Sequence, residues 1–143
     1  MKSLFLIFLS VLTLNSFSQS VPAKGDYISC QTLGYEPVNY IFKNKMVFYG
    51  YYPSTKKTEN SYKQDAKLVK ELFDMADAAG LDKMKSLNEN SLILERGDQQ
   101  EATFTIIEYK KGNQIYRICW DPVANDENSQ KLNKIYGKMT GFW

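Results

Sequence analysis

Two runs of β-branched and aromatic residues give the clearest hydrophobic pattern in the chain. They lie within Ala102–Trp120 and flank the pair Gly112-Asn113. Such a pair between two runs is typical of a tight β-hairpin, because both residue types accept the positive φ that the turn requires. The pattern therefore predicts two antiparallel strands, the second of which ends at Trp120.

Three further runs of strand-forming residues precede this hairpin. They are Asp26–Thr32, Val38–Lys43 and Met46–Tyr52. Asn44 separates the second run from the third and predicts a second hairpin. Apolar and aromatic residues occupy both alternating sets of positions in the third run. This indicates a strand that is covered on both faces or one that carries an aromatic surface.

A helical periodicity follows Pro53–Asn60, which is polar and predicted to be a loop. Ser61 and Gln64 have the spacing of a capping box and predict the start of the helix. Gly80 predicts its end, with Leu81 packing just beyond it. The apolar stripe of this helix consists of Val69, Leu72, Phe73, Ala76 and Ala79.

The remaining segments predict a connector, a short strand and a final helix. Asp82–Asn90 is the connector, Ser91–Glu95 is the predicted strand, and Arg96–Gln99 is its turn. Asp126 is placed to cap the final helix. Gly137 within that helix costs about 1 kcal/mol relative to Ala, so we expect close packing or an early bend there. The apolar positions of the helix are Leu132, Ile135, Tyr136 and Met139.

A hairpin followed by a helix thus occurs twice, at 38–80 and at 102–141. Strands joined by hairpins pair antiparallel. We therefore predict an α+β fold, with a largely antiparallel sheet of five or six strands and two helices packed on one face.

The first eighteen residues have the features of a signal peptide. Lys2 supplies the positive charge, Leu4–Leu14 is a short apolar run, and Ser16 and Ser18 are small residues at the positions that signal peptidase recognises. The apolar run is shorter than the roughly 20 residues of a membrane-spanning helix. We expect cleavage after Ser18 or Ser20, no retained membrane anchor, a single domain at 19–143, and a periplasmic or extracellular location.

Composition limits the chemistry that this domain can perform. Without Lys2 the chain has 17 basic and 16 acidic residues, so its charge gives no argument for binding nucleic acid. Histidine is absent, which removes the commonest general base and zinc ligand. No Gly-rich phosphate loop or calcium loop is present. We expect no cofactor, no metal site and no catalytic residue. Hydrolysis of glycans by two carboxylates remains an alternative.

Two cysteines and ten tyrosines are the remaining features. Cys30 and Cys119 lie in predicted strands and can form a disulfide in an oxidising compartment, or remain as two buried thiols. Tyr116 and Trp120 share a strand face that we expect to pack beneath the helices, while Arg117 points to the other face. Tyrosine offers a large contact area with a polar tip, which suits a binding surface. The predicted binding residues are Tyr35, Tyr40, Tyr49, Tyr51 and Tyr52.

The order of these features resembles that of small exported bacterial α+β domains of unknown function. The resemblance rests on the signal, a strand pair that ends in Phe48-Tyr49-Gly50, the amphipathic helix, the Cys119–Pro122 segment and the last helix. It implies a periplasmic or secreted domain and no particular active site. We expect a non-catalytic binding module whose aromatic strand face contacts a protein, peptide or glycan. The alternatives are an enzyme acting on envelope or extracellular glycans and a structural or inhibitor protein of the envelope.

Overall fold

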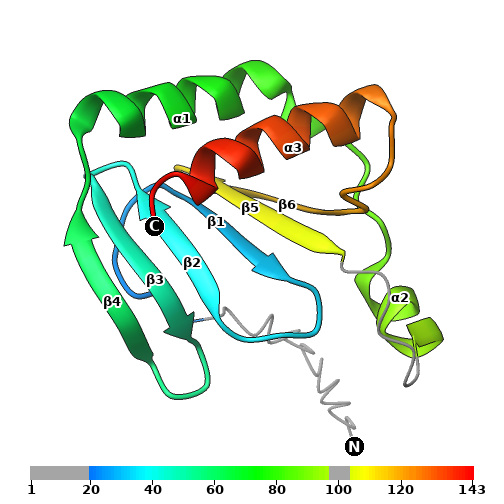
Figure 1. Ribbon diagram of the computed structural model, residues 1–143, viewed down its shortest axis with the longest axis horizontal. Helices are drawn as coiled ribbons and strands as arrows, with labels where there is room; N and C mark the ends of the chain where they lie inside the picture. Colours follow the sequence, from blue (N-terminus) through cyan, green and yellow to red (C-terminus); the bar gives the residue numbers. More distant parts are fainter. Residues whose placement is uncertain (1–19, 97–103) are drawn as a thin grey trace, which may run out of the picture.

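The computed structural model describes residues 20–96 and 104–143 (Figure 1). Within these ranges the chain forms a six-stranded antiparallel sheet and three α-helices, which confirms the predicted α+β class. The predicted signal peptide at 1–18 lies outside the described residues, as does most of the turn predicted at 96–99.

The first four strands form a meander, and the C-terminal hairpin adds to its β1 edge. The sheet order is therefore β4-β3-β2-β1-β5-β6. The strands are β1 (Tyr27–Thr32), β2 (Val38–Phe42), β3 (Met46–Tyr52), β4 (Lys57–Lys63), β5 (Thr105–Lys111) and β6 (Gln114–Trp120). The helices are α1 (Ala66–Ala79), α2 (Glu89–Arg96) and α3 (Glu127–Thr140), with a 3-10 turn at Leu81–Lys83.

Helices α1 and α3 cover one face of the sheet (Figure 1). The predicted stripe of α1 is confirmed, since its residues pack against aliphatic side chains of the sheet and of α3. Gly80 ends α1 at a φ of 71°, a left-handed conformation that glycine adopts without strain. The chain terminus docks on the same side, where Phe142 is buried and Trp143 lies against Tyr49.

Two boundaries differ from the prediction around the start of α1. The segment predicted as a loop at 53–60 contributes to β4, a strand at the edge of the sheet. Polar and charged residues are tolerated there, because most of its side chains are exposed and a charged edge resists pairing with other chains. The helix begins after Asp65, whose Oδ1 accepts hydrogen bonds from the amides of Lys67 and Leu68. Ser61 therefore lies in β4 and is not the cap.

Two further predictions are wrong beyond α1. The segment Ser91–Glu95 lies in helix α2 and is not a strand. Asn88 explains the difference, because its Oδ1 accepts a hydrogen bond from the Ser91 amide in the manner of a helix cap. In α3 the Asp126 cap is confirmed, but a Cβ on Gly137 would have no neighbour within 4 Å. Close packing is therefore not the reason for that glycine.

The other face of the sheet carries an aromatic cluster. Its buried members are Tyr27, Val38, Tyr40, Phe42 and Tyr51. The segment that leads into β1 packs on this cluster through Ala23, and the Ser20 hydroxyl lies 3.1 Å from the Tyr51 hydroxyl. Next to β5 and β6, Leu92 of α2 packs on Ile106 and Cys119. Both faces of the sheet are thus buried, by different elements.

The two cysteines do not form the disulfide that the sequence allowed. Cys30 lies on β1 and Cys119 on β6, with β5 between these strands. Strands lie about 4.8 Å apart, so two steps exceed the roughly 4.4–6.8 Å between Cα atoms that a disulfide needs. The side chains also pack on opposite faces, Cys30 beneath the helices and Cys119 beside α2. The alternative of two buried thiols is the arrangement found.

Candidate functional site

The five tyrosines predicted to bind a partner do not form one surface. Tyr40 and Tyr51 are 1 % and 3 % exposed, and their rings contact each other inside the aromatic cluster. Tyr49 lies against Trp143 on the helix-covered side. Tyr35 is 53 % exposed in the β1–β2 loop, and Tyr52 donates a hydrogen bond to Glu59 of β4.

A β-bulge separates Tyr49 from Tyr51. Tyr40 pairs with Phe48 and Val38 pairs with Tyr51, so one residue of β2 faces two residues of β3. Gly50 adopts a φ of 67° there, and a Cβ at this position would lie 2.7 Å from the Glu59 side chain. The extra residue interrupts the simple alternation of the strand, and this divides the tyrosines between the two faces.

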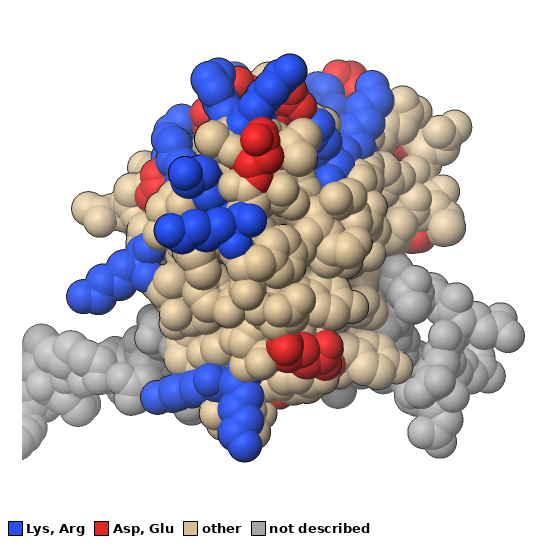
Figure 2. Space-filling model, turned by 60° about the vertical axis from the view of Figure 1, so that its left-hand side comes forward, with Lys and Arg blue, Asp and Glu red and all other residues tan. Residues whose placement is uncertain are grey.

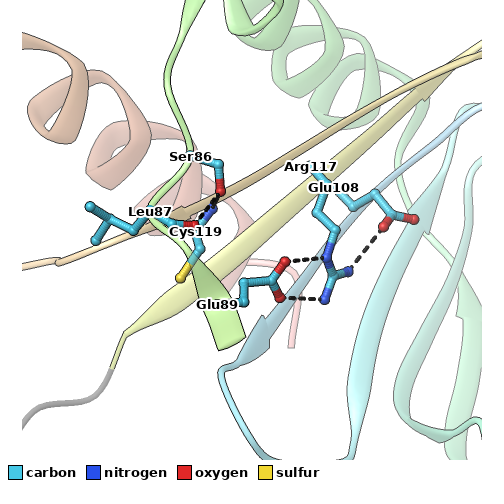
Figure 3. A network of polar contacts seen from close by, with 6 residues as sticks. All are labelled: Ser86, Leu87, Glu89, Glu108, Arg117 and Cys119. Carbon is cyan, nitrogen blue, oxygen red and sulfur yellow. Dashed lines mark hydrogen bonds and ion pairs between the residues drawn. The ribbon is translucent and has the colours of Figure 1, made fainter. Parts of the chain in front are cut away.

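A charged network lies on the face opposite α1 and α3 (Figure 3). Arg117 of β6 points between Glu108 of β5 and Glu89 of α2. Its Nε and Nη2 donate to the two carboxylate oxygens of Glu89 at 3.0 and 2.9 Å, and its Nη1 donates to Oε2 of Glu108 at 3.0 Å. The Tyr27 hydroxyl donates a hydrogen bond to the other oxygen of Glu108. Each of the four carboxylate oxygens therefore accepts a hydrogen bond.

The pKa values of this network follow from its burial and its charges. Burial alone would lower the pKa of Arg117, but the hydrogen bonds and charges of Glu89 and Glu108 raise it. Burial, followed by the hydrogen bond to Glu108, raises the pKa of Tyr27. Arg117 and the two glutamates thus form an ion triplet, with the Tyr27 phenol beside it. This arrangement fastens α2 to the sheet.

Beside the network, the connector between the 3-10 turn and α2 lies along β6. The Leu87 amide donates to the Cys119 carbonyl, and the Ser86 hydroxyl accepts from the Cys119 amide, both at 2.9 Å (Figure 3). These bonds satisfy the backbone amide and carbonyl of Cys119 on the outer edge of β6. Residues 86–89 are therefore fixed to the sheet by both backbone and side-chain contacts.

A groove of about 420 Å³ lies between the β2–β3 turn and α1. Val69 and Phe73, both buried, form its apolar floor. Lys43 and Lys45 project from the turn on one side, and Ala66, Lys70 and Asp74 lie on the other. Figure 2 shows many basic side chains, with acidic ones among them, over the upper part of this side of the molecule, above a middle that is largely uncharged.

Backbone contacts fix the turn against the helix. The Gln64 amide donates to the Lys45 carbonyl at 2.9 Å, which joins the turn to the start of α1. Lys45 has a left-handed φ of 78°, and the Asn44 side chain accepts from the Met46 amide. Lys43 Nζ lies 6.0 Å from the centre of the Phe73 ring, at the limit of a cation–π contact. The two lysines are therefore held at the mouth of the groove.

The opposite end of the groove carries an acidic residue, Asp77, whose carboxylate already has hydrogen-bond partners. The Asp77 carboxylate accepts from the Tyr109 hydroxyl at 2.6 Å and from Lys111 Nζ at 2.9 Å. The hydrogen bond from Tyr109, and then that from Lys111, lowers the pKa of Asp77 against the opposing effect of desolvation. Beyond Asp77 a smaller hollow of about 220 Å³ continues past Leu81 and Asp82. The carboxylate at this end of the groove is thus already paired within the fold.

Sequence reasoning missed the groove because its walls lie more than twenty residues apart in the chain. Lys43 and Lys45 stand in an ordinary polar turn, and Phe73 looks like any other member of the stripe of α1. The first turn of α1 gives no signal either, since Asp65 caps the helix and Lys67 does not line the groove.

Several other kinds of site are absent from the described residues. Within residues 20–96 and 104–143, no three Asp, Glu or Cys side chains are grouped so that they could hold a metal ion. No helix in the same ranges has the length and apolar character that crossing a bilayer requires. Comparison with known protein families, curated proteins and solved structures gives no significant match for this chain.

Proposed function

We propose that this protein is a non-catalytic binding module that acts outside the cytoplasm and binds its partner in the groove between the β2–β3 turn and α1. The observation that carries the proposal is the groove itself, which combines a preformed apolar floor with two lysines at its mouth. Its volume lies within the range of about 300–1,000 Å³ that is typical of small-molecule sites.

The charged network supports a binding role over a catalytic one. Glycosidase chemistry needs one carboxyl that gives up a proton and one that attacks or activates water. Glu89 and Glu108 instead use all their oxygens as acceptors for Arg117 and Tyr27. Neither borders the groove. Their role in holding α2 accounts for the network without any reaction.

The burial of Tyr40 and Tyr51 moves the proposed binding surface away from the aromatic strand face. A ligand could reach these rings only if the segment around Ala23 left the cluster. The groove needs no such rearrangement.

A blocked groove tests the proposal. Ala66 is exposed and lines the groove, whereas Ala78 is exposed on the same helix and does not. We expect Ala66→Trp to weaken binding of the fluorescent probe 1-anilinonaphthalene-8-sulfonate by at least about tenfold, and Ala78→Trp to change it by less than about twofold. Equal affinity of the wild-type protein and Ala66→Trp, or no binding by the wild-type protein, would contradict the proposal.

Export is tested separately. The full-length chain is expressed in a Gram-negative host, and the periplasmic fraction is examined by mass spectrometry. We expect a processed protein that begins at Gln19 or Val21. Recovery of the unprocessed chain from the cytoplasm alone would contradict an extracytoplasmic role.

A further inference from the structure

We infer that the groove binds a small organic anion, whose charged group pairs with Lys43 and Lys45 while its aromatic or aliphatic body lies on Phe73 and Val69. This inference rests on the proposed function, because it names the class of ligand for the same groove. It is carried by the charges at the mouth of the groove, the apolar floor and the acidic far end.

Neither lysine at the mouth of the groove forms an ion pair within the described residues, although the charge of Lys43 contributes to the lowered pKa of Asp77. Lys70 forms an ion pair with Asp74 at 2.6 Å, and Lys111 forms one with Asp77 at 2.9 Å. Among the described residues no carboxylate lies within ion-pair distance of Lys43 or Lys45. Two lysines at one mouth repel each other. An anion bound between them would remove this repulsion and gain two ionic contacts.

The helix start does not supply the binding charge by itself. The amides of Lys67 and Leu68 already donate to the Asp65 carboxylate. The cap therefore satisfies two of the donors that an anion at a helix terminus would use. Recognition of the anion consequently depends on the lysine side chains of the turn.

The floor indicates that the ligand has an apolar body. The groove exposes more apolar than polar surface, and Phe73 presents its ring beneath Lys43. A hydrated inorganic anion would gain nothing from this ring. An organic acid would bury its apolar body there while its charged group stayed at the solvent-exposed mouth.

The far end of the groove favours a ligand with one acidic group over an extended polyanion. The lining contains three lysines and the two aspartates Asp74 and Asp77, which gives a net charge of +1. The adjoining hollow adds Asp82 and Lys111, which leaves this net charge unchanged. A nucleic acid strand or an anionic membrane surface laid along the groove would meet these carboxylates. A compact ligand with a single negative group avoids them.

The test compares two probes that differ only in a sulfonate group. 1-Anilinonaphthalene-8-sulfonate carries a sulfonate, and N-phenyl-1-naphthylamine has the same aromatic body without it. We expect the anionic probe to bind roughly tenfold more tightly at low ionic strength. Opposite charges about 4 Å apart in water attract by about 1 kcal/mol, so each lysine should raise the affinity for the sulfonate by about fivefold. Screening by salt reduces the combined effect of the two lysines to about tenfold.

Two substitutions test whether the lysines of the turn cause the preference for the anionic probe. Lys43→Gln with Lys45→Asn removes both charges, and Asn tolerates the left-handed conformation of position 45. The double variant is expected to bind the anionic probe about tenfold more weakly and the neutral probe within about twofold of the wild-type protein. Lys57→Gln is the matched control, since Lys57 lies beyond the β3–β4 turn at the other end of the sheet. Thermal unfolding checks that each variant is folded.

The outcomes separate this inference from the proposed function. If Ala66→Trp abolishes binding but both probes bind equally well, the groove is a binding site and the inference of an anionic ligand is wrong. If the double lysine variant binds the anionic probe as the wild-type protein does, the inference is also wrong. If Ala66→Trp has no effect on either probe, the proposed function fails and the inference fails with it.

Discussion

The face of the sheet beneath α1 and α3 is filled largely by aliphatic side chains, whereas the opposite face is filled by tyrosines and phenylalanines beside an ion triplet. On the first face most buried side chains are apolar and are stabilised by packing, and the polar tips of Tyr109 and Trp120 bond to Asp77 and Asn133. On the second face each buried hydroxyl or carboxylate needs a partner. Glu108, Arg117 and Tyr27 supply those partners to one another.

This difference bears on function. Two partly buried glutamates, Glu108 on the sheet and Glu89 on α2, invite a catalytic interpretation, but here their hydrogen-bonding capacity is used within the fold. The lysines at the mouth of the groove are the contrasting case, since they are held in place without ionic partners among the described residues. For this reason we base the proposed binding site on lysines without an ion pair and not on the partly buried carboxylates.

The largest expected effect comes from a cavity on the helix-covered face. Leu72 is fully buried in α1, and Leu72→Ala should lower the free energy of unfolding by about 3–4 kcal/mol. Leu68 lies on the same helix but is 37 % exposed, so Leu68→Ala should cost less than about 1 kcal/mol. Urea denaturation measures both values. Equal losses would show that this face is not the tightly packed one.

The second-largest effect is expected from a substitution that breaks the ion triplet. Arg117→Leu leaves two partly buried carboxylates without their cation, and we expect a loss of about 2 kcal/mol, reduced from the value for a fully buried pair because the Arg117 side chain is 30 % exposed. The amides of α2 should also exchange with solvent faster, since Arg117 links this helix to the sheet. Unchanged exchange in α2 would contradict the fastening role. Glu89→Gln, which leaves the Glu108 bond in place, should have a smaller effect.

The third effect is a sensitivity to alkali that belongs to the aromatic cluster. Burial raises the pKa of Tyr40, with a contribution from the charge of Glu108. The neutral phenol therefore stabilises the fold fully below its unfolded pKa of about 10, and this contribution is lost as the pH rises above 10 toward the higher folded pKa. Tyr40→Phe should make the fall in stability above pH 10 shallower by about 1.4 kcal/mol per pH unit. Parallel curves for the variant and the wild-type protein would refute this assignment.

A smaller effect on stability at low pH is expected from Asp77, at the far end of the groove. Asp77 has a lowered pKa, so its charged form stabilises the fold above its unfolded pKa of about 3.9, and this contribution is lost as the pH falls through the folded value. Its side chain is 43 % exposed and screened by solvent, so the contribution should be below about 1 kcal/mol. Asp77→Asn should flatten the stability curve below pH 4. A variant curve as steep as that of the wild-type protein would contradict this contribution.

The smallest expected effect concerns the cysteines. Because no disulfide joins β1 to β6, a reductant should shift the melting temperature by less than about 1 °C. Burial raises the pKa of the Cys30 thiol to about 12, so this thiol should resist alkylation until the protein unfolds. A large fall in melting temperature with dithiothreitol would show that the two strands are linked.

The sequence predicted most of the fold because its strongest patterns are local. The Gly112-Asn113 turn and the apolar stripe of α1 can each be predicted from residues that are close together in the sequence. The pattern failed at β4, whose residues are polar because the strand lies at an exposed edge. It also failed at α2, where a short apolar run does not distinguish a helix from a strand and the Asn88 cap decides the outcome.

The candidate site was much less predictable. Strict alternation would put Tyr49 and Tyr51 on one face, but the bulge at Gly50 depends on the Asn39 side chain of the neighbouring strand, which accepts its amide hydrogen bond. The groove depends on the pairing of strands and on the docking of α1, which bring Lys43 to Phe73. No local periodicity encodes either contact. Both arise from tertiary structure.

The most direct test of the binding proposal is to map the position of a bound probe by NMR. 1-Anilinonaphthalene-8-sulfonate is titrated into the ¹⁵N-labelled protein, and the shifts of the backbone amides are followed. We predict saturable shifts confined to the β2–β3 turn around Lys43 and to the first turns of α1, from Ala66 to Phe73. Shifts centred on Tyr35 and Tyr52 at the other end of the sheet, or on α2 beside Arg117, would contradict it.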